Sequence, residues 1–225
     1  MSDQRPLLRV VDGLTLPEKY RRVLRPGELM YDRHDRARRL PRWFYEVGSW
    51  SAAQETKLTP HFALWEFLDV DVREAEPLRR GFPRYLPCAV TLLAAALELF
   101  RQEVDTYVHV AANGGYRSPA HRLNHHATPH CWGTAVNVYR IGDTFLDSQD
   151  EIEHYNRLAK RLLPAFAVRP FGYTRGHVDD HVHLDVGFTT LVPREAEGED
   201  AEDEGEPHDA PHPAAAEAEQ ATEPA

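Results

Sequence analysis

Histidines are frequent in this chain and gather in two segments that lie far apart in the sequence. The 225 residues include 13 histidines. Outside the acidic C-terminal tail, most of them belong to a first group of His121, His125, His126 and His130 or to a second group of His177, His181 and His183. Neutral imidazoles are common zinc ligands, and a fold can bring two such segments together. The pattern indicates a metal site, although a histidine-rich loop can also be an ordinary polar surface.

The second histidine group lies on a segment that reads as a β-strand. Residues 181–188 (HVHLDVGF) alternate between polar and apolar side chains, so that His181, His183 and Asp185 share one face of the strand. Asp180 directly precedes this segment. A carboxylate three residues before a metal-bound His183 could act as a general base if the chain bends there. The alternative is an ordinary exposed polar face.

Three motifs together resemble the zinc D-Ala-D-Ala carboxypeptidase family, which includes bacterial cell-wall D,D-peptidases and vancomycin-resistance dipeptidases. They are GGYRSPAH at 114–121, TPHCWGTAVN at 128–137 and HLD at 183–185. The family pattern is a GYRSP-like turn, then Ser-x-His-x-x-Gly-x-Ala-x-Asp, then a late Asp-x-x-His. LTPHFALWEF at 58–67 also looks like the opening of one branch. The resemblance covers about residues 58–188 and implies a small α+β domain whose antiparallel sheet carries zinc.

The resemblance implies a role for several individual residues. His130 and His183 match zinc ligands, and Asp180 matches the catalytic carboxylate. Arg117 matches the arginine that binds the carboxyl group of the substrate, and a guanidinium is well shaped for that task. Two further residues would lie beside the substrate: Thr128 takes the place of the family's serine, and Tyr116 either packs on the substrate or supports the turn.

One position departs from the family pattern. The residue seven places after His130, where the family has an aspartate ligand, is Asn137. An amide oxygen can bind zinc, but it is neutral and a poorer ligand than a carboxylate. The site could instead recruit Asp185, His181 or Cys131, although Cys131 is interpreted here as a packing residue.

With Asn137 in place of the aspartate, three alternative functions are open. The first is a zinc peptidase that cleaves D-amino-acid peptide bonds of peptidoglycan stems, as a carboxypeptidase or an endopeptidase. The second is a weak or inactive relative that binds such peptides without cleaving them. The third is an interaction module in a larger assembly. Zinc content separates the first from the others.

The charge of the chain is divided unevenly. The formal net charge is −10, from 36 acidic and 26 basic residues. Residues 195–225 contain 12 acidic residues and no Lys or Arg, so the rest of the chain is close to neutral. That tail has no aromatic or branched aliphatic side chain, which predicts a disordered segment from residue 194 onward. Neither a signal peptide nor a membrane-spanning segment is recognisable, which predicts a cytoplasmic protein, unless lysis or injection releases it.

Residues 1–57 form a basic N-terminal extension that we expect to pack on the main domain, residues 58–193. Five arginines fall between residues 33 and 42, and the aromatic residues 43–45 follow them. The arginines could bind an anionic polymer, but Asp32, Asp35 and Glu46 lie among them, and no nucleic-acid-binding motif is present. We therefore expect local ion pairs and no nucleic-acid partner.

The remaining pattern predicts a compact α+β domain. The two cysteines, Cys88 and Cys131, are too few for a disulfide framework. The predicted helices are residues 86–103, a short one from Ser118, and 148–166, which begins with a capping box. The predicted strands are residues 106–112, 134–141 and 181–188.

Overall fold

The fold combines α-helices with antiparallel sheets, so the predicted α+β class is confirmed. The computed structural model describes residues 8–173 and 179–193. The acidic tail and His177 lie outside these residues. Within them the α-helices are α1 (Glu18–Leu24), α2 (Trp50–Glu55), α3 (Glu76–Arg79), α4 (Val90–Val104) and α5 (Gln149–Leu162). Three 3-10 helices are η1 (Gly13–Thr15), η2 (Leu64–Phe67) and η3 (Pro129–Trp132).

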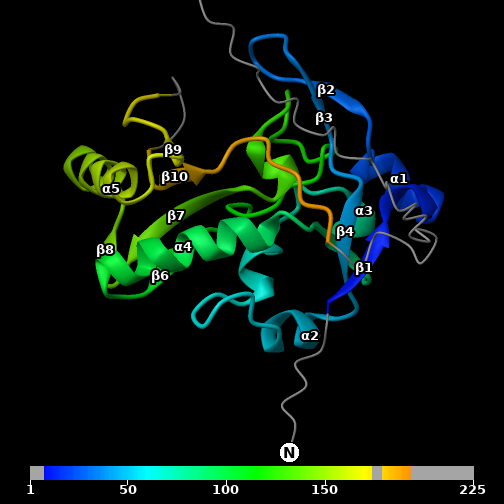
Figure 1. Cartoon of the computed structure of the whole chain (residues 1–225), viewed down its shortest axis with the longest axis horizontal. Helices are drawn as coiled ribbons and strands as arrows, with labels where there is room; N and C mark the ends of the chain where they lie inside the picture. Colours follow the sequence, from blue (N-terminus) through cyan, green and yellow to red (C-terminus); the bar gives the residue numbers. More distant parts are fainter. Residues whose placement is uncertain (1–7, 174–178, 194–225) are drawn as a thin grey trace, which may run out of the picture.

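The described strands form three antiparallel sheets (Figure 1). The first sheet has the order β1 (Arg9–Asp12), β4 (Trp43–Val47), β5 (Arg84–Pro87). The second has the order β6 (Val108–Val110), β7 (Ala135–Ile141), β10 (Val182–Asp185), β9 (Ala167–Val168), and β8 (Thr144–Phe145) also pairs with β7. The third is a hairpin of β2 (Leu29–Tyr31) and β3 (Ala37–Arg39), which projects at the top of Figure 1.

Two predicted helices differ from the structure. The helix predicted from residue 86 begins at Val90, because residues 84–87 form β5 and pair with β4. The helix predicted from Ser118 is wrong, since that segment is a series of turns. Ser148 is the N-cap of α5, as predicted, because its hydroxyl accepts a hydrogen bond from the Glu151 amide at 3.4 Å. The reciprocal bond of a capping box is not present among the described residues, since the Glu151 carboxylate accepts from the Ser148 hydroxyl at 2.7 Å. That helix stops at Leu162, before Pro164, which cannot continue it.

One face of the second sheet belongs to the hydrophobic core. Val136 and Val138 of β7 and Val182 and Leu184 of β10 are fully buried, and they belong to the same apolar cluster as α4 and α5. Helix α4 contacts β7, and α5 contacts β9 and β10. Because side chains alternate along a strand, residues between these core positions point to the opposite face. The strand residues of the candidate site lie on that opposite face.

The N-terminal extension is built into the body. Strand β4 lies between β1 and β5, and its Phe44 is 1% exposed. Phe44 belongs to the same apolar cluster as Leu97 of α4. Phe44 therefore joins the extension to residues of the main domain in one apolar cluster.

The β2–β3 hairpin packs on the segment around η3. Met30 and Leu40 form a small apolar cluster with Ala127, Cys131 and Trp132. The Ala127 amide also donates a hydrogen bond to the Tyr31 carbonyl at 2.8 Å. The hairpin is therefore fixed to the same short helix that carries His130.

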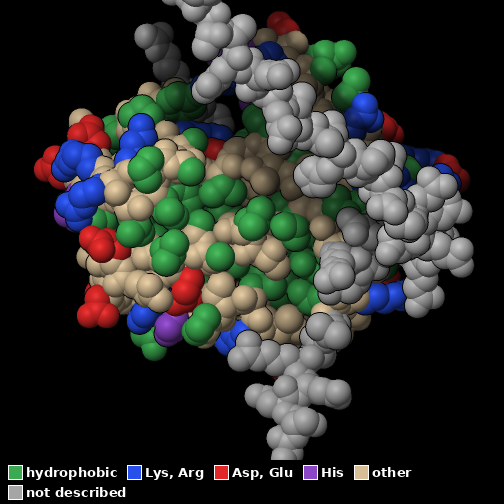
Figure 2. All heavy atoms as spheres, viewed as in Figure 1, with side chains coloured by type: hydrophobic (Ala, Val, Ile, Leu, Met, Phe, Trp, Pro, Cys, Tyr) green, Lys and Arg blue, Asp and Glu red, His purple; other side chains and the backbone are tan. Residues whose placement is uncertain are grey.

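The local ion pairs expected for the arginines between residues 33 and 42 are present only in part. Asp32 pairs with Arg36 and Arg38, as expected, whereas Arg42 pairs with Asp12 and Glu46 pairs with Arg9, which are distant in the sequence. On the face in Figure 2, apolar side chains are spread over the middle, and many of the charged ones lie toward its margins. No helix among the described residues is long and apolar enough to cross a membrane.

Replacing Phe44 with alanine should destabilise the whole body. Removing a fully buried phenylalanine leaves a cavity, so we expect the free energy of unfolding to fall by about 3–5 kcal/mol. Because the extension and the main domain share one apolar cluster, denaturant unfolding should stay a single transition. The control is Leu14→Ala, at a side chain that is 48% exposed, which should cost much less. Two separate transitions would contradict a shared core.

Candidate metal and substrate site

His130 lies in η3 with one ring nitrogen bonded and the other free. Its Nδ1–H donates a hydrogen bond to the Gly115 carbonyl at 2.9 Å, which leaves the lone pair on Nε2. The Nε2 atom is buried and has no hydrogen-bond partner among the described residues. Burial, followed by the charges of Arg117 and His183, lowers the pKa of His130 well below its ordinary value. His130 is therefore a neutral imidazole with an unused acceptor.

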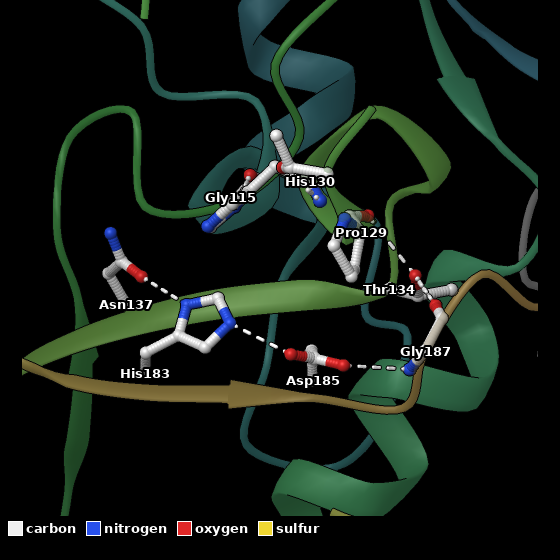
Figure 3. A network of polar contacts seen from close by, with 9 residues as sticks. Gly115, Pro129, His130, Thr134, Asn137, His183, Asp185 and Gly187 are labelled. Atoms are coloured by element: carbon white, nitrogen blue, oxygen red, sulfur yellow. Dashed lines mark hydrogen bonds and ion pairs between the residues drawn. The ribbon is translucent and has the colours of Figure 1, made fainter. Parts of the chain in front are cut away.

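His183 lies on β10, directly opposite Asn137 of β7 (Figure 3). Its Nε2–H donates to the Asp185 carboxylate at 2.9 Å, and that carboxylate also accepts a hydrogen bond from the Gly187 amide. Burial lowers the pKa of His183 to about 4, although the Asp185 carboxylate opposes the shift. The ring is therefore neutral near pH 7, and its Nδ1 carries a lone pair.

The Nδ1 atom of His183 lies 2.9 Å from the Oδ1 atom of Asn137. Both atoms are acceptors when the imidazole is neutral, so they repel each other as they stand. Two arrangements remove this repulsion. A cation can bind both atoms, or the Asn137 amide can rotate so that its NH₂ group donates to Nδ1.

The His130 and His183 rings are close neighbours. Their centroids are 5.2 Å apart, with one ring edge toward the other. Together with Asn137, they offer two imidazole nitrogens and one amide oxygen, which is a donor set that zinc accepts weakly. Among residues 8–173 and 179–193, no three His, Cys, Asp or Glu side chains form a group that could hold a metal. The metal site predicted from the sequence therefore depends on the amide of Asn137.

The other ligands considered from the sequence have other partners. Asp185 binds His183, as described above. His181 Nδ1 lies 2.7 Å from the Asp180 carboxylate. The Cys131 sulfur accepts a hydrogen bond from the side-chain amide of Asn124 at 3.2 Å. Burial raises the pKa of the Cys131 thiol to about 12. Both Cys131 and Cys88 are buried and form no disulfide.

Arg117 presents an unpaired guanidinium inside the protein. Its residue is 9% exposed, and its side chain forms no hydrogen bond or ion pair with any described residue. Burial lowers the pKa of Arg117 to about 10. The Arg117 amide donates to the His130 carbonyl at 3.2 Å, so this arginine is fixed beside the histidine pair. A buried, unpaired cation of this kind favours an anionic ligand.

Glu74, which sequence reasoning missed, holds the loop that carries Arg117. The Glu74 carboxylate accepts hydrogen bonds from the Ser118 amide at 3.0 Å and the Ser118 hydroxyl at 2.6 Å. Glu74 lies outside the motifs, and only the fold brings it to the loop.

His121 supports the same loop. His121 Nε2–H donates to the Asn113 side chain at 3.0 Å, and its Nδ1 accepts from the Leu123 amide at 3.1 Å. Both ring nitrogens are therefore used within the loop. His125 and His126, the two histidines between His121 and His130, are exposed.

The paired glycines of this motif allow the backbone to pack closely. A Cβ atom on Gly115 would lie 2.6 Å from the Phe67 Cα atom, and one on Gly114 would lie 2.5 Å from the Ala111 carbonyl oxygen. Neither site can hold a side chain without moving the backbone. The close packing places the Gly115 carbonyl within reach of His130.

Three further residues were predicted to belong to the site, and each lies in a different environment. Thr128 caps η3, because its hydroxyl accepts a hydrogen bond from the His130 amide at 3.2 Å. Tyr116 is buried in the core, and its hydroxyl has no partner among the described residues. The Asp180 side chain is 60% exposed and pairs with His181. Within the described part of the chain, Asp180 forms no hydrogen bond or ion pair with either ring of the histidine pair.

Arg169, which follows β9, is a further residue near the site that no motif indicated. Its positive charge contributes to the lowered pKa of His130, His183 and Arg117, after burial as the main cause. The sequence around it, AVRPF at 167–171, carries no recognisable signal.

The free energy of unfolding should fall as the pH drops from about 6.5 to about 4. Folded His121 and His183 take up protons only near pH 4, whereas the unfolded imidazoles do so near their ordinary value of 6.5. The unfolded chain therefore binds more protons in this interval and is favoured. At pH 5 we expect a loss on the order of 2 kcal/mol for each histidine.

Urea unfolding at pH 7 and pH 5 measures this loss. His121→Asn should reduce it, whereas His154→Asn, at an exposed position of α5, should not. Equal stability at the two pH values would contradict the burial of neutral histidines.

Comparisons with protein-family models, with curated proteins and with solved structures gave no match to this chain.

Proposed function

We propose that this chain is a zinc-dependent peptidase that acts on D-amino-acid peptide bonds, as its resemblance to the D-Ala-D-Ala carboxypeptidase family implies. The observation that carries the proposal is the buried, unpartnered Nε2 atom of His130 beside the neutral ring of His183. A buried acceptor without a partner costs free energy, and a bound cation would remove that cost.

The residues that would hold zinc are His130, His183 and Asn137. The Gly115 carbonyl and the Asp185 carboxylate already fix the two rings through their other nitrogens, which is the usual support for metal-binding histidines. Zinc, when bound, supplies a Lewis acid and activates a water near neutral pH. The neutral Asn137 amide would make this zinc weakly bound.

Arg117 would bind the C-terminal carboxylate of the peptide. Its unpaired guanidinium offers two parallel N–H donors, which match a carboxylate. A free carboxylate next to the scissile bond corresponds to carboxypeptidase activity, so we favour this activity over an endopeptidase. The substrate class is a short peptide that ends in D-Ala-D-Ala, such as a peptidoglycan stem.

Asp180 would accept the proton of the attacking water. The support is its place three residues before His183, as in the family pattern. In this role the carboxylate would have to exchange its contact with His181 for one with the water.

A second candidate is a relative that binds the same peptides without zinc. Asn137 favours this candidate, because its rotated amide can donate to His183 Nδ1 and satisfy the site without a cation. Arg117 would still bind the peptide carboxylate. Metal content and hydrolysis separate the two candidates.

Zinc binding tests the first candidate directly. The native protein, purified without a histidine tag, should bind about one zinc per chain in equilibrium dialysis. His130→Ala should abolish binding, because it removes the free imidazole nitrogen. Asn137→Asp should tighten binding about tenfold or more, because a carboxylate replaces an amide. The control is His154→Ala on α5. Native protein without zinc, together with an Asn137→Asp variant without zinc, would contradict the metal site.

Hydrolysis separates catalysis from binding. We expect release of D-alanine from an acylated peptide that ends in D-Ala-D-Ala, and Asn137→Asp should increase the rate. Asp180→Ala should abolish release while zinc content stays unchanged, because the proposed role is proton transfer and not metal binding. Arg117→Gln should raise KM, because it removes the carboxylate partner. Tight peptide binding with no hydrolysis in either the native chain or Asn137→Asp would favour the second candidate.

A further inference from the structure

We propose that Arg33, Arg169 and Tyr173 form a second anion-binding subsite beside Arg117, so that the preferred ligand carries a second carboxylate besides its C-terminal one. The subsite rests on the proposed function for the role of Arg117, but its own residues lie outside every motif. One of them comes from the N-terminal extension, which the family resemblance does not cover.

Tyr173 brings the two arginines together. The Arg33 guanidinium lies 4.9 Å from the centroid of the Tyr173 ring, and the Arg169 guanidinium lies 5.8 Å from it. Two guanidinium groups on one aromatic ring hold two positive charges in a small volume. Tyr173 is 39% exposed, so the group is open to solvent.

The position of Arg33 is set by a rigid turn at the tip of the β2–β3 hairpin. The Asp32 carboxylate accepts hydrogen bonds from the His34 amide at 2.9 Å and the Arg36 amide at 3.1 Å. The Tyr31 carbonyl binds the Ala127 amide, three residues before His130. The turn is therefore tied to the segment that carries the metal-site histidine.

The backbone of Arg169 is equally well fixed. Its neighbour Val168 pairs with Leu184 of β10, next to His183. The Arg169 carbonyl accepts a hydrogen bond from the side-chain amide of Asn156, on α5, at 2.7 Å. Both arginines are thus placed by the elements that build the candidate site.

The charges of this group are not compensated by the described residues. Arg36 and Arg38 of the same hairpin pair with Asp32, but neither Arg33 nor Arg169 has a carboxylate of the described chain within ion-pair distance. The carboxylate that most affects Arg169 belongs to Asp185, and it already binds His183 and the Gly187 amide. A carboxylate of a ligand would find charged donors here and no competing anion from residues 8–173 or 179–193.

Of the two arginines, Arg169 is also electrostatically linked to Arg117. Burial lowers the pKa of Arg169, Asp185 opposes the shift, and Arg33 lowers it further. The pKa of Arg117 is lowered by burial first and also by Arg169. Arg169 is therefore close enough to act on both Arg33 and Arg117, which places the subsite beside the arginine proposed to bind the C-terminal carboxylate.

The test uses two small compounds that differ mainly in charge. N-acetyl-D-glutamate has two carboxylates, and N-acetyl-D-glutamine has one and nearly the same size. NMR titration of the native protein should give a Kd about tenfold lower for the glutamate compound. Arg33→Gln and Arg169→Gln should each reduce this ratio toward one, and should leave the Kd of the glutamine compound unchanged within about twofold. Arg117→Gln should weaken both compounds.

The matched control is Arg22→Gln, which removes the same charge from an exposed i,i+4 pair on α1 and should keep the ratio. A native ratio near one, no binding of either compound, or an undiminished ratio in the Arg33→Gln/Arg169→Gln double variant would overturn the subsite. The test needs neither zinc nor hydrolysis. A tenfold ratio in a chain without zinc contradicts the peptidase proposal alone, whereas a ratio of one in an active enzyme contradicts the subsite alone.

Discussion

The antiparallel register between β7 and β10 is the constraint on which the candidate site depends. It places His183 directly opposite Asn137 and leaves Asp185 to bind the far nitrogen of the same ring. On the reverse face, Val138 and Leu184 are buried in the core. Because a slip of one residue would exchange the two faces of a strand, burial of these apolar residues fixes the register. The core therefore determines which polar side chains meet.

The sequence predicts this part of the structure well because the signal is local. Alternation along residues 134–141 and 181–188 separates the apolar residues from Asn137 and His183, and Ser148, as the N-cap, marks the start of α5. The strand β5 was missed because its residues, RYLP, precede a helix without a break and become a strand only by pairing with β4. Long-range pairing of this kind leaves little trace in a short window of sequence.

The site shows the same division between local and long-range information. His130, His183, Asn137 and Arg117 could be found from motifs. Glu74 and Arg169 could not, because their roles arise from burial and from contacts between distant segments. The histidine-rich loop shows the reverse case. Its composition suggests metal ligands, but His121 uses both ring nitrogens for hydrogen bonds within its own loop. Side-chain type alone does not distinguish a free imidazole from a satisfied one.

The place of β10 in the second sheet also has a consequence for biosynthesis. A chain leaves the ribosome from its N-terminus, so β7 and the His130 segment emerge well before residues 182–185. Until then β7 has an unpaired edge, and the acceptor of His130 has no second imidazole beside it. The nascent protein must therefore pass through a stage in which most of the core residues are made but the two histidines have not met. Any ligand that needs both can enter only after that stage.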